Sequence, residues 1–460
     1  MAPLILFHIN EKPVHVPSFP GIFLSRADGE TLGLKDGQHA DVQIGNKKSA
    51  AYIFLQNDLT EGMGKVDSAL YSQLGIPLQN IRWNVRFHKE SGHLKLGPFL
   101  SILTEIRQDG NGQPHFGSIH CFAEELHAFT QKNGGYLTLM GLPSTGSSIG
   151  AQTSFYLDDD HWKQTTLPLP DVVYNRIHSR KTERSEMFKL LYSQLIDEGT
   201  VIFNPHFLSK WEVHQFLRNE SHLLPYIPLT DLYTRSGLAA YLDEFGAAFI
   251  KPIHGSQGRG IIEIKRKNGS YHISQTTYHQ IRDHQISDLQ EAETLIAAWI
   301  GKRACIIQQS LQLISLDDKK IDFRLLVHPN RSKKWTVTSA VARLSAENQF
   351  VSNLAQGGTI NKPLTVLREF FTSDKAHYIY SLMKELAVES SKTLSESIEG
   401  VAGEFGLDIG VDQSGKTWII EVNTKPSKQS EQIQTPFRPS TKAIWNFAEI
   451  LWQERRLQDD

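Results

Sequence analysis

A glycine-rich turn in the middle of the chain has the composition of an anion-binding loop. It follows a short apolar strand that ends in Lys251, and its residues are Gly255, Ser256, Gln257, Gly258, Arg259 and Gly260. Glycines let the backbone turn tightly and point N–H groups at an anion. The G-x-x-x-x-G-K-[ST] pattern is absent, and the apolar residues 261–264 predict a strand rather than a helix. We expect a hairpin loop that covers phosphates, with an ordinary hairpin turn as the alternative.

Three oxygen-bearing residues nearer the C-terminus have the spacing of a metal site. Glu421 and Asn423 lie two apart on a predicted strand, so their side chains share one face. Asp408 lies on the preceding predicted strand, and Asp412 belongs to the turn between the two. Such ligands suit a hard cation such as Mg²⁺, which keeps waters and phosphate oxygens as its other ligands. An exposed sheet face, where acidic residues are common, is the alternative.

Two arginines lie on a predicted pair of strands between these stretches. Arg324 and Arg343 belong to residues 322–327 and 335–344, which flank a Pro-Asn turn. A guanidinium fork binds phosphate or carboxylate oxygens in bidentate fashion. Surface cross-strand charge pairing is the alternative role. The polar, glycine-bearing residues 351–358 follow, and loops of this kind often line a site.

Composition limits the class of protein. A length of 460 residues predicts about two to four domains. A net charge of -2 gives no support for nucleic acid as a partner. Two cysteines, Cys121 and Cys305, do not make a disulfide framework and fit a reducing compartment. No apolar run approaches the roughly 20 residues of a membrane helix, and the first residues do not resemble a signal peptide, so we expect a cytoplasmic protein.

The N-terminal half changes pattern near residue 95. Residues 1–95 carry short apolar runs between glycine turns, which predicts a small β-barrel. Beyond them, strand 99–103, helix 122–132 and strand 136–140 predict a βαβ unit with a parallel sheet, and 171–176 a further strand. The basic residues 176–184 are either a solvated loop or an anion-binding loop for a substrate.

The remaining elements follow from apolar periodicity. Ser209 and Glu212 predict a capping box at the start of one helix. The other predicted helices span residues 185–198, 235–245, 289–300, 374–395 and 441–455, and the other predicted strands span 201–204 and 305–309.

Taken in chain order, these segments resemble the ATP-grasp superfamily over about residues 200–455. The residues that carry the resemblance are Lys210, Lys251, the 255–260 turn, Gln308, Gln309, Asp322, Arg324, Arg343, residues 352–358, Asp408, Glu421 and Asn423. Residues 406–412 and 421–426, with Leu96-Gly97-Pro98 before them, are most similar to the YheC/YheD-type endospore coat-associated protein family. The resemblance implies an α/β (α+β) fold: a β-rich N-terminal domain over 1–95, a pre-ATP-grasp α/β domain over 96–204 and an ATP-grasp domain over 205–460.

The resemblance also implies roles for the site residues. Lys210 and Lys251 hold the α- and β-phosphates of ATP under the 255–260 loop, and the Gln308, Gln309 and Leu311 segment reads adenine. Mg²⁺ or Mn²⁺ is held by Asp408, Glu421 and Asn423. The residues that face the γ-phosphate and an acyl phosphate are Arg324, Arg343 and Asn353.

Three functions fit this resemblance. The leading one is an ATP-dependent ligase that activates a carboxylate, of a small molecule or a polymer end, for attack by an amine or other nucleophile. The alternatives are a structural spore-coat protein that keeps the fold, and a phosphotransferase that stops at phosphorylation. By resemblance alone, the spore coat is an alternative to the expected cytoplasmic location, and coat proteins are then candidate partners.

Overall fold

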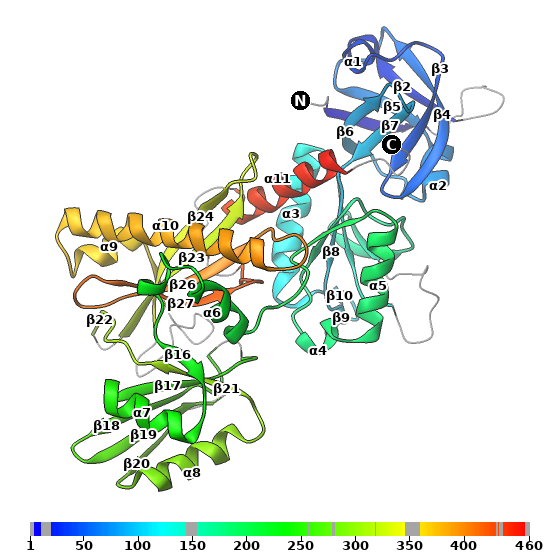
Figure 1. Cartoon of the computed structure of the whole chain (residues 1–460). Helices are drawn as coiled ribbons and strands as arrows, with labels where there is room; N and C mark the ends of the chain where they lie inside the picture. The colour runs from blue at the N-terminus through cyan, green and yellow to red at the C-terminus, as the bar shows by residue number, and fades with distance from the viewer. Residues whose placement is uncertain are drawn as a thin grey trace.

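The computed structural model describes the chain at residues 4–10, 20–143, 154–255, 258–277, 281–317, 319–345, 359–428, 431 and 436–455. Figure 1 shows a β-barrel at the N-terminal end, a middle α/β unit, and two further sheets with their helices. The expected mixed α/β class is confirmed. The three-domain division at residues 95 and 204 stays a prediction.

The N-terminal strands close into a barrel in the order β1-β5-β2-β4-β3-β7-β6, as the glycine-punctuated apolar runs predicted. Its strands are β1 (Leu4–Asn10), β2 (Gly21–Ser25), β3 (Gln38–Ile44), β4 (Lys47–Gln56), β5 (Met63–Asp67), β6 (Ile81–His88) and β7 (His93–Gly97). Two short helices, α1 (Arg26–Leu32) and α2 (Ser68–Leu74), pack beside it. Alternating apolar residues such as Ile5 and Trp83 fill the interior.

The middle sheet has the order β13-β12-β11-β8-β14-β15. Its elements are β8 (Phe99–Leu103), α3 (His120–Asn133), β11 (Tyr136–Met140), β12 (Ser154–Asp158), β13 (His161–Thr165), β14 (Val172–Asn175), α4 (Arg180–Glu183), α5 (Glu186–Asp197) and β15 (Val201–Phe203). A small ribbon, β9 (Arg107–Gln108) with β10 (Pro114–His115), and the 3₁₀ turn η1 (Gly117–Ile119) lie between β8 and α3. The parallel pairing of β8 with β11 confirms the βαβ unit. The antiparallel edge hairpin β12–β13 was not predicted.

The third sheet is antiparallel in the order β16-β21-β17-β18-β19-β20. Its elements are β16 (Thr230–Leu232), α7 (Arg235–Phe245), β17 (Ala247–Pro252), β18 (Ile262–Lys267), β19 (Ser270–Thr276), β20 (Ile281–Ile286), α8 (Leu289–Ile300) and β21 (Cys305–Gln309). Apolar residues of α7 and α8 form one core with the sheet, so the strands are held from the helix side.

The fourth sheet has the order β25-β24-β23-β26-β27, with β22 beside β23. Its elements are β22 (Ser315–Leu316), β23 (Lys319–Pro329), β24 (Trp335–Leu344), β25 (Thr359–Asn361), β26 (Phe405–Val411) and β27 (Thr417–Asn423). The helices of this region are α6 (Lys210–Arg218), α9 (Pro363–Arg368), α10 (Ser373–Ser397) and α11 (Pro439–Glu454), with the 3₁₀ turn η2 (Leu224–Tyr226) after α6.

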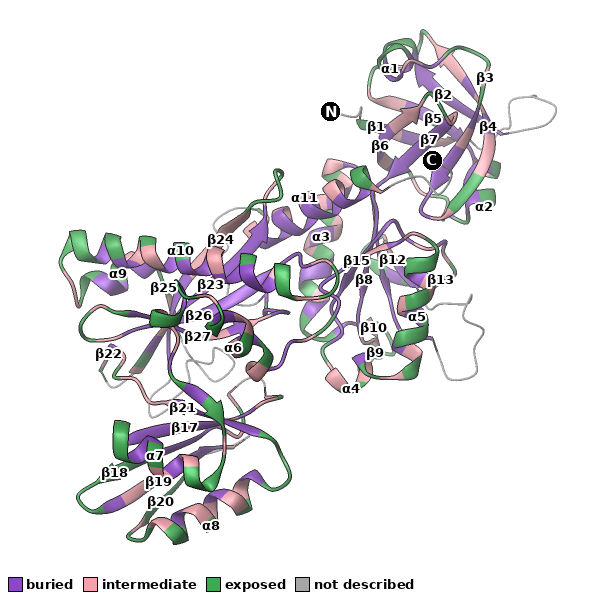
Figure 2. Ribbon diagram, viewed as in Figure 1, coloured by how far each residue is buried: buried purple, intermediate pink, exposed green. Residues whose placement is uncertain are grey.

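Strand β23 shows how this sheet separates core from site. Phe323 and Leu325 point into an apolar core shared with α10, whose buried face appears purple in Figure 2. Asp322 and Arg324 alternate with them and therefore face the other side. One face of the sheet is thus occupied by packing, and the opposite face carries the charged side chains.

Helix α11 joins the fourth sheet to the middle unit. It contacts β23 and β24 of the one and α3 of the other. Its residues Ile444, Trp445 and Phe447 belong to the same apolar core as the middle sheet. The C-terminal helix, which the sequence predicted from its apolar stripe, therefore fixes the two units against each other (Figure 1).

Candidate nucleotide and metal site

A cavity lies between the third and fourth sheets and is lined from α6, β17, β21 and β27. Its polar lining comes from Lys210, Lys251, Gln308 and Glu421, together with His214 and Thr230. Its apolar lining comes from Val213, Leu217, Ile227, Ile306, Ile419, Ile420 and Val422. The structure thus brings Lys210 and Glu421 into one cavity although they are 211 positions apart in sequence.

Lys210 is placed by the start of α6. Ser209 accepts a hydrogen bond from the Glu212 amide at 3.1 Å, and Glu212 accepts one from the Ser209 amide at 2.7 Å. This is the predicted capping box, and it fixes the first turn from which Lys210 projects. The Lys210 ammonium donates to the Glu421 carboxylate. A predicted phosphate ligand and a predicted metal ligand are therefore direct partners in the cavity.

Lys251 lies on β17 and faces the same cavity. Its ammonium donates to the Gln308 side-chain oxygen at 2.5 Å. Burial lowers the pKa of Lys251 to about 8, and the charge of Lys210 acts in the same direction. The partner is a neutral amide, so Lys251 contributes a positive charge that an anion can neutralise.

The glycine turn joins β17 to β18, which confirms the expected hairpin. Gly258 and Gly260 have φ of 71° and 69°, a backbone region that glycine adopts readily. Thr276 of β19 donates its hydroxyl to the Gly258 carbonyl at 2.6 Å, and its carbonyl accepts from the Gly260 amide at 3.0 Å. Gly255 is also described, whereas Ser256 and Gln257 lie outside the described residues.

The expected adenine-reading segment begins on β21. Gln308 donates its side-chain amide to the Thr230 hydroxyl at 3.0 Å, and its side-chain oxygen accepts from Lys251. The Gln309 backbone amide donates to the Leu229 carbonyl at 2.9 Å, which ties β21 to the start of β16. Leu311 follows β21 in the link toward the fourth sheet. The role of this segment in nucleotide binding stays a prediction.

Arg324 and Arg343 form a cluster with two aspartates, which we call the arginine–aspartate cluster (Asp322, Arg324, Arg343 and Asp408). Arg324 grips Asp408 through Nε and Nη2, at 2.5 and 2.9 Å. Arg343 grips Asp322 at 2.6 and 2.7 Å and also reaches Asp408 at 2.9 Å. Both arginines are buried, so the surface alternative is wrong although the cross-strand pairing occurs.

Opposed charges set the ionisation of this cluster. Burial acts to raise the pKa of Asp408, but Arg324 and Arg343 outweigh it and hold the pKa below its ordinary range. Burial acts to lower the pKa of Arg343, and Asp408 and Asp322 reverse that effect. Burial also raises the pKa of Asp322 despite Arg343. Arg343 therefore stays charged, and Asp408 is the firmly ionised carboxylate.

The register of β26 and β27 brings the expected metal ligands together. Asp408 lies directly opposite Glu421, and Asn423 lies opposite Gly406. Residues opposite each other in an antiparallel pair share a face. Asp412, in contrast, accepts hydrogen bonds from the amides of Ser414 and Lys416, which confirms its place in the turn. Asn353 lies outside the described residues.

Comparison with known proteins identifies the family. The YheC/D-like ATP-grasp family has a sequence profile that matches residues 199–451. The chain belongs to this family. It is 30% identical over 369 residues to the endospore coat-associated protein YheD of Bacillus subtilis (strain 168), covering 78% of each chain. It is 26% identical over 275 residues to YheC of the same organism, covering 58% of this chain and 74% of that protein.

Solved structures also resemble the chain. The VanG D-Ala:D-Ser ligase of Enterococcus faecalis aligns with a TM-score of 0.44 and 13% identity, over 77% of this chain and 97% of that chain. In the described part of the chain, no helix is long and apolar enough to cross a membrane.

The donor set of this ATP-grasp chain fits a magnesium ion at two of its three expected positions. Glu421 contacts Lys210 through one carboxylate oxygen, and its other oxygen remains for a cation. Asn423 adds a neutral amide oxygen on the same strand face. Both oxygens of Asp408 already accept from arginine, so Asp408 can serve a metal only by sharing its lone pairs. Among the described residues, no three His, Cys, Asp or Glu side chains gather in a metal-binding arrangement.

The basic segment 176–184 divides into two parts. Arg176 is 1% exposed, so neither a solvated loop nor an open anion site describes it. Its guanidinium donates to Glu404 at 3.0 Å and to the Pro426 carbonyl at 3.1 Å. Arg180, further along, is half-buried, and burial lowers its pKa although Glu183 and Glu421 oppose this effect.

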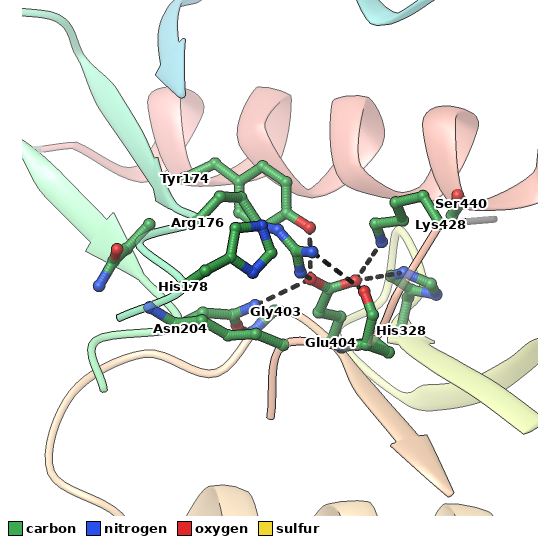
Figure 3. Close-up of polar contacts among 12 residues, drawn as sticks. Tyr174, Arg176, His178, Asn204, His328, Gly403, Glu404, Lys428 and Ser440 are labelled. Carbon is green, nitrogen blue, oxygen red and sulfur yellow. Dashed lines mark hydrogen bonds and ion pairs between the residues drawn. The ribbon is translucent and has the colours of Figure 1, made fainter. Parts of the chain in front are cut away.

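Glu404 is the centre of a second charge cluster that sequence reasoning missed. Its carboxylate accepts from Tyr174 and Lys428, from Arg176 at 3.0 Å, and from Asn204 at 3.2 Å. His328 lies 3.5 Å from the same carboxylate. Figure 3 shows these side chains around Glu404. We call these six residues the junction cluster, because Tyr174 and Arg176 belong to the middle unit and Glu404 directly precedes β26 of the fourth sheet. Their only sequence signal is polar residues inside apolar segments, with no spacing that links them.

Proposed function

We propose that the chain is an ATP-dependent ligase that activates a carboxylate as an acyl phosphate and lets an amine or other nucleophile displace the phosphate. The observation that carries the proposal is the cavity between the two sheets, where Lys210, Lys251 and Glu421 converge. The apolar lining on α6 and β21 supports binding of a purine ring beside these charges. Family membership supports the same conclusion.

The charges of the cavity residues indicate separate roles in binding phosphate and metal. Lys251 has a neutral partner and Lys210 has Glu421, so both ammonium groups are positioned for phosphate oxygens. Glu421 and Asn423 are proposed to hold Mg²⁺ or Mn²⁺, with Asp408 sharing its oxygens. The metal would neutralise phosphate charge. With the metal bound, Glu421 would serve as its ligand in place of its contact with Lys210, and the Lys210 ammonium would be available to a phosphate oxygen.

The proposed chemistry needs no protein nucleophile. A carboxylate oxygen of the substrate attacks the γ-phosphorus and ADP leaves; the nucleophile then attacks the acyl carbon, and inorganic phosphate leaves with the carboxylate oxygen. Arg324 and Arg343 are proposed to stabilise the charge that moves between these groups, with Asn353 beside them. Their present carboxylate partners hold the guanidinium groups in fixed positions. Positioning and charge neutralisation are the main contributions in phosphoryl transfer.

Calorimetry with Mg-ATP on the full chain tests the proposal. We expect binding by the wild type, and loss of the Mg²⁺-dependent part of the affinity, by about tenfold or more, in Glu421→Gln combined with Asn423→Ala. Asp412→Asn is the control, because Asp412 lies on the same hairpin but serves the turn. A wild type that binds no nucleotide, with or without Mg²⁺, would overturn the ligase function.

A second candidate is a structural spore-coat role without nucleotide. It is favoured by one observation: Asp408 and Glu421 already have cationic partners inside the chain. The name of the relative YheD, an endospore coat-associated protein, supports a coat location for either function. Unchanged thermal stability on addition of Mg-ATP at millimolar concentration would favour this candidate.

A further inference from the structure

We propose that Arg180, Arg184 and His254 form a subsite for an anionic group, a carboxylate or a phosphate, on the substrate that the ligase activates. The inference rests on the proposed function and narrows the substrate class to molecules with an anionic group besides the carboxylate that reacts. The three side chains come from the middle unit and from the glycine turn, and they meet beside the nucleotide cavity.

The position of the subsite follows from short contacts. Arg180 and Arg184 are four residues apart, and the Arg184 amide donates to the Arg180 carbonyl at 3.1 Å, so their side chains share a helical face. The Arg184 guanidinium lies 3.4 Å from Nε2 of His254. His254 stands directly before Gly255, and the preceding Ile253 carbonyl accepts from the Lys210 amide at 3.2 Å. The basic group is therefore adjacent to the start of α6.

Arg180, Arg184 and His254 differ from the neighbouring cations in their surroundings. Within the described residues, no acidic side chain forms an ion pair with any of them. Arg180 donates to the Leu208 carbonyl at 3.3 Å and lies 4.9 Å from the Phe207 ring centroid. Its Nε is buried, and no described residue accepts its hydrogen. The neighbouring cations differ in this respect, since Arg176 is paired with Glu404 and Lys425 with Glu183.

Repulsion between the charges of Arg180 and Arg184 favours binding of an anion beside them. Burial lowers the pKa of Arg180, and Arg184 adds to the effect, although Glu183 and Glu421 oppose it. Burial, Arg184 and Arg180 all lower the pKa of His254, against Glu212. Like charges four residues apart on a helix are destabilising. An anion between them would relieve this repulsion and satisfy the buried Nε.

The segment that carries Arg180 and Arg184 is held in place by hydrogen bonds of neighbouring residues. Glu105 accepts from the amides of His178 and Ser179 at 3.0 and 2.9 Å, which fixes the chain before α4. Glu183 accepts from the Phe207 amide at 3.1 Å and from Lys425. Because these anchors use neighbouring residues, Arg180 and Arg184 remain available, and the subsite is preorganised.

The experiment measures anion binding to the full chain already saturated with Mg-AMPPNP, which occupies the γ-phosphate position. Inorganic phosphate and succinate are titrated separately at constant ionic strength, which distinguishes a phosphate subsite from a carboxylate subsite. The variant is Arg184→Gln, and the matched control is Lys181→Gln, which removes the same charge from an exposed position on the same helix. We expect the wild type and Lys181→Gln to bind one of these anions alike, and Arg184→Gln to bind it at least tenfold more weakly. Nucleotide affinity should be unchanged in all three.

Other results overturn the subsite. Absence of binding of either anion to the loaded wild type would do so, as would equal losses in the two variants, which would indicate only the general field of the surface. A loss of nucleotide affinity in Arg184→Gln would assign the arginine to ATP instead. If the wild type binds no nucleotide, the ligase proposal fails separately. The same anion titration without nucleotide then decides whether the subsite stands by itself.

Discussion

The arginine–aspartate cluster and the junction cluster both place ionised carboxylates among cations on strands of the fourth sheet or their direct extensions. Asp408 and Glu404 each have a pKa below the ordinary range, because nearby cations outweigh burial. The surroundings differ. The side chains of Arg324, Arg343 and Asp408 are 9 to 11% exposed and Asp322 is 19% exposed, whereas those of Arg176, Glu404 and Lys428 are 0 to 2% exposed.

Because the two clusters differ in exposure, they also differ in whether a ligand can replace one of their ion-pair partners. Glu404 accepts from three donors at one oxygen and from Lys428 at the other, and these donors come from both structural units. A ligand would have to break the unit interface to reach it. The arginine–aspartate cluster lies on the free face of its sheet, beside Glu421 in register. The ion pairs of the junction cluster therefore hold the two units together. In the cluster beside the cavity, a ligand can replace an ion-pair partner.

The comparison also explains how strand β27, which carries Glu421 and Asn423, is held in position. Lys425 and Pro426 lie two and three positions after Asn423, and both are hydrogen-bonded to the middle unit. Arg176 donates to the Pro426 carbonyl, and Lys425 donates to the Ile177 carbonyl at 3.2 Å. The end of β27, which carries Glu421 and Asn423, is thus fixed to the middle unit.

Glu404→Gln should have the largest effect on stability. It leaves Arg176 and Lys428 buried without a counter-charge, which by comparison with other buried pairs destabilises by about 3 to 5 kcal/mol. Hydrogen exchange of amides in β14 and β26 measures this locally. Protection equal to that of the wild type would show that the junction tolerates an unpaired charge. Asp243→Asn is the control, because the Asp243–Arg266 pair is exposed and should change little.

Asp408→Asn should act on ligand binding more than on stability. Arg343 keeps Asp322 as a partner, and Arg324, although buried, keeps 9% of its side-chain surface exposed, through which water can reach it. We expect Mg-ATP affinity to fall about tenfold or more, with exchange protection of β14 unchanged. Calorimetry and hydrogen exchange on the same sample check both parts. If β14 instead lost exchange protection while Mg-ATP affinity stayed normal, both clusters would act on stability, and the contrast between them would be wrong.

Lys251 predicts a pH dependence at the cavity that the junction should not share. Its pKa is lowered to about 8, so the free site loses this positive charge above pH 8, and Mg-ADP affinity should fall by up to about tenfold per pH unit between pH 8 and 9. Stability responds with the opposite sign. The unfolded chain keeps the ordinary pKa of 10.5 and binds more protons above pH 8, so the free energy of unfolding rises with pH there.

Lys251→Arg provides the test of that pH dependence, because arginine stays charged throughout the range. Mg-ADP affinity of this variant, measured by calorimetry at pH 7, 8 and 9, should lose the downward slope above pH 8. A wild-type affinity that is flat from pH 7 to 9 would contradict the assignment of Lys251 to nucleotide binding.

The sequence predicted the cavity side better than the junction side for a physical reason. Alternation on β23, with Asp322 and Arg324 between Phe323 and Leu325, already separates a charged face from an apolar one. The two-residue spacing of Glu421 and Asn423 likewise indicates that their side chains share a face. Local periodicity therefore reaches most of this site, and the strands that carry it were predicted within a few residues.

The periodicity of apolar residues does not predict contacts that form only when distant elements pack together. Arg176 and Glu404 are 228 residues apart, and the sequence around Arg176 is rich in basic residues, which favoured a solvated loop. The pairing of Lys210 with Glu421 was also not foreseen, since each was assigned a ligand of its own. Pairings between elements that meet only after folding leave no spacing signal.

Tyr174→Phe should have the smallest effect and separates charge from hydrogen bonding at the junction. The Tyr174 hydroxyl is one of three donors to the same Glu404 oxygen, and Arg176 and Asn204 remain after its removal. We expect a loss of about 1 kcal/mol in hydrogen exchange of β14, and unchanged Mg-ATP affinity. A loss as large as that of Glu404→Gln would mean that the donors act as one cooperative network. A small loss would mean that neutralising Arg176 and Lys428 is what makes Glu404 necessary, whereas the number of its hydrogen bonds matters little.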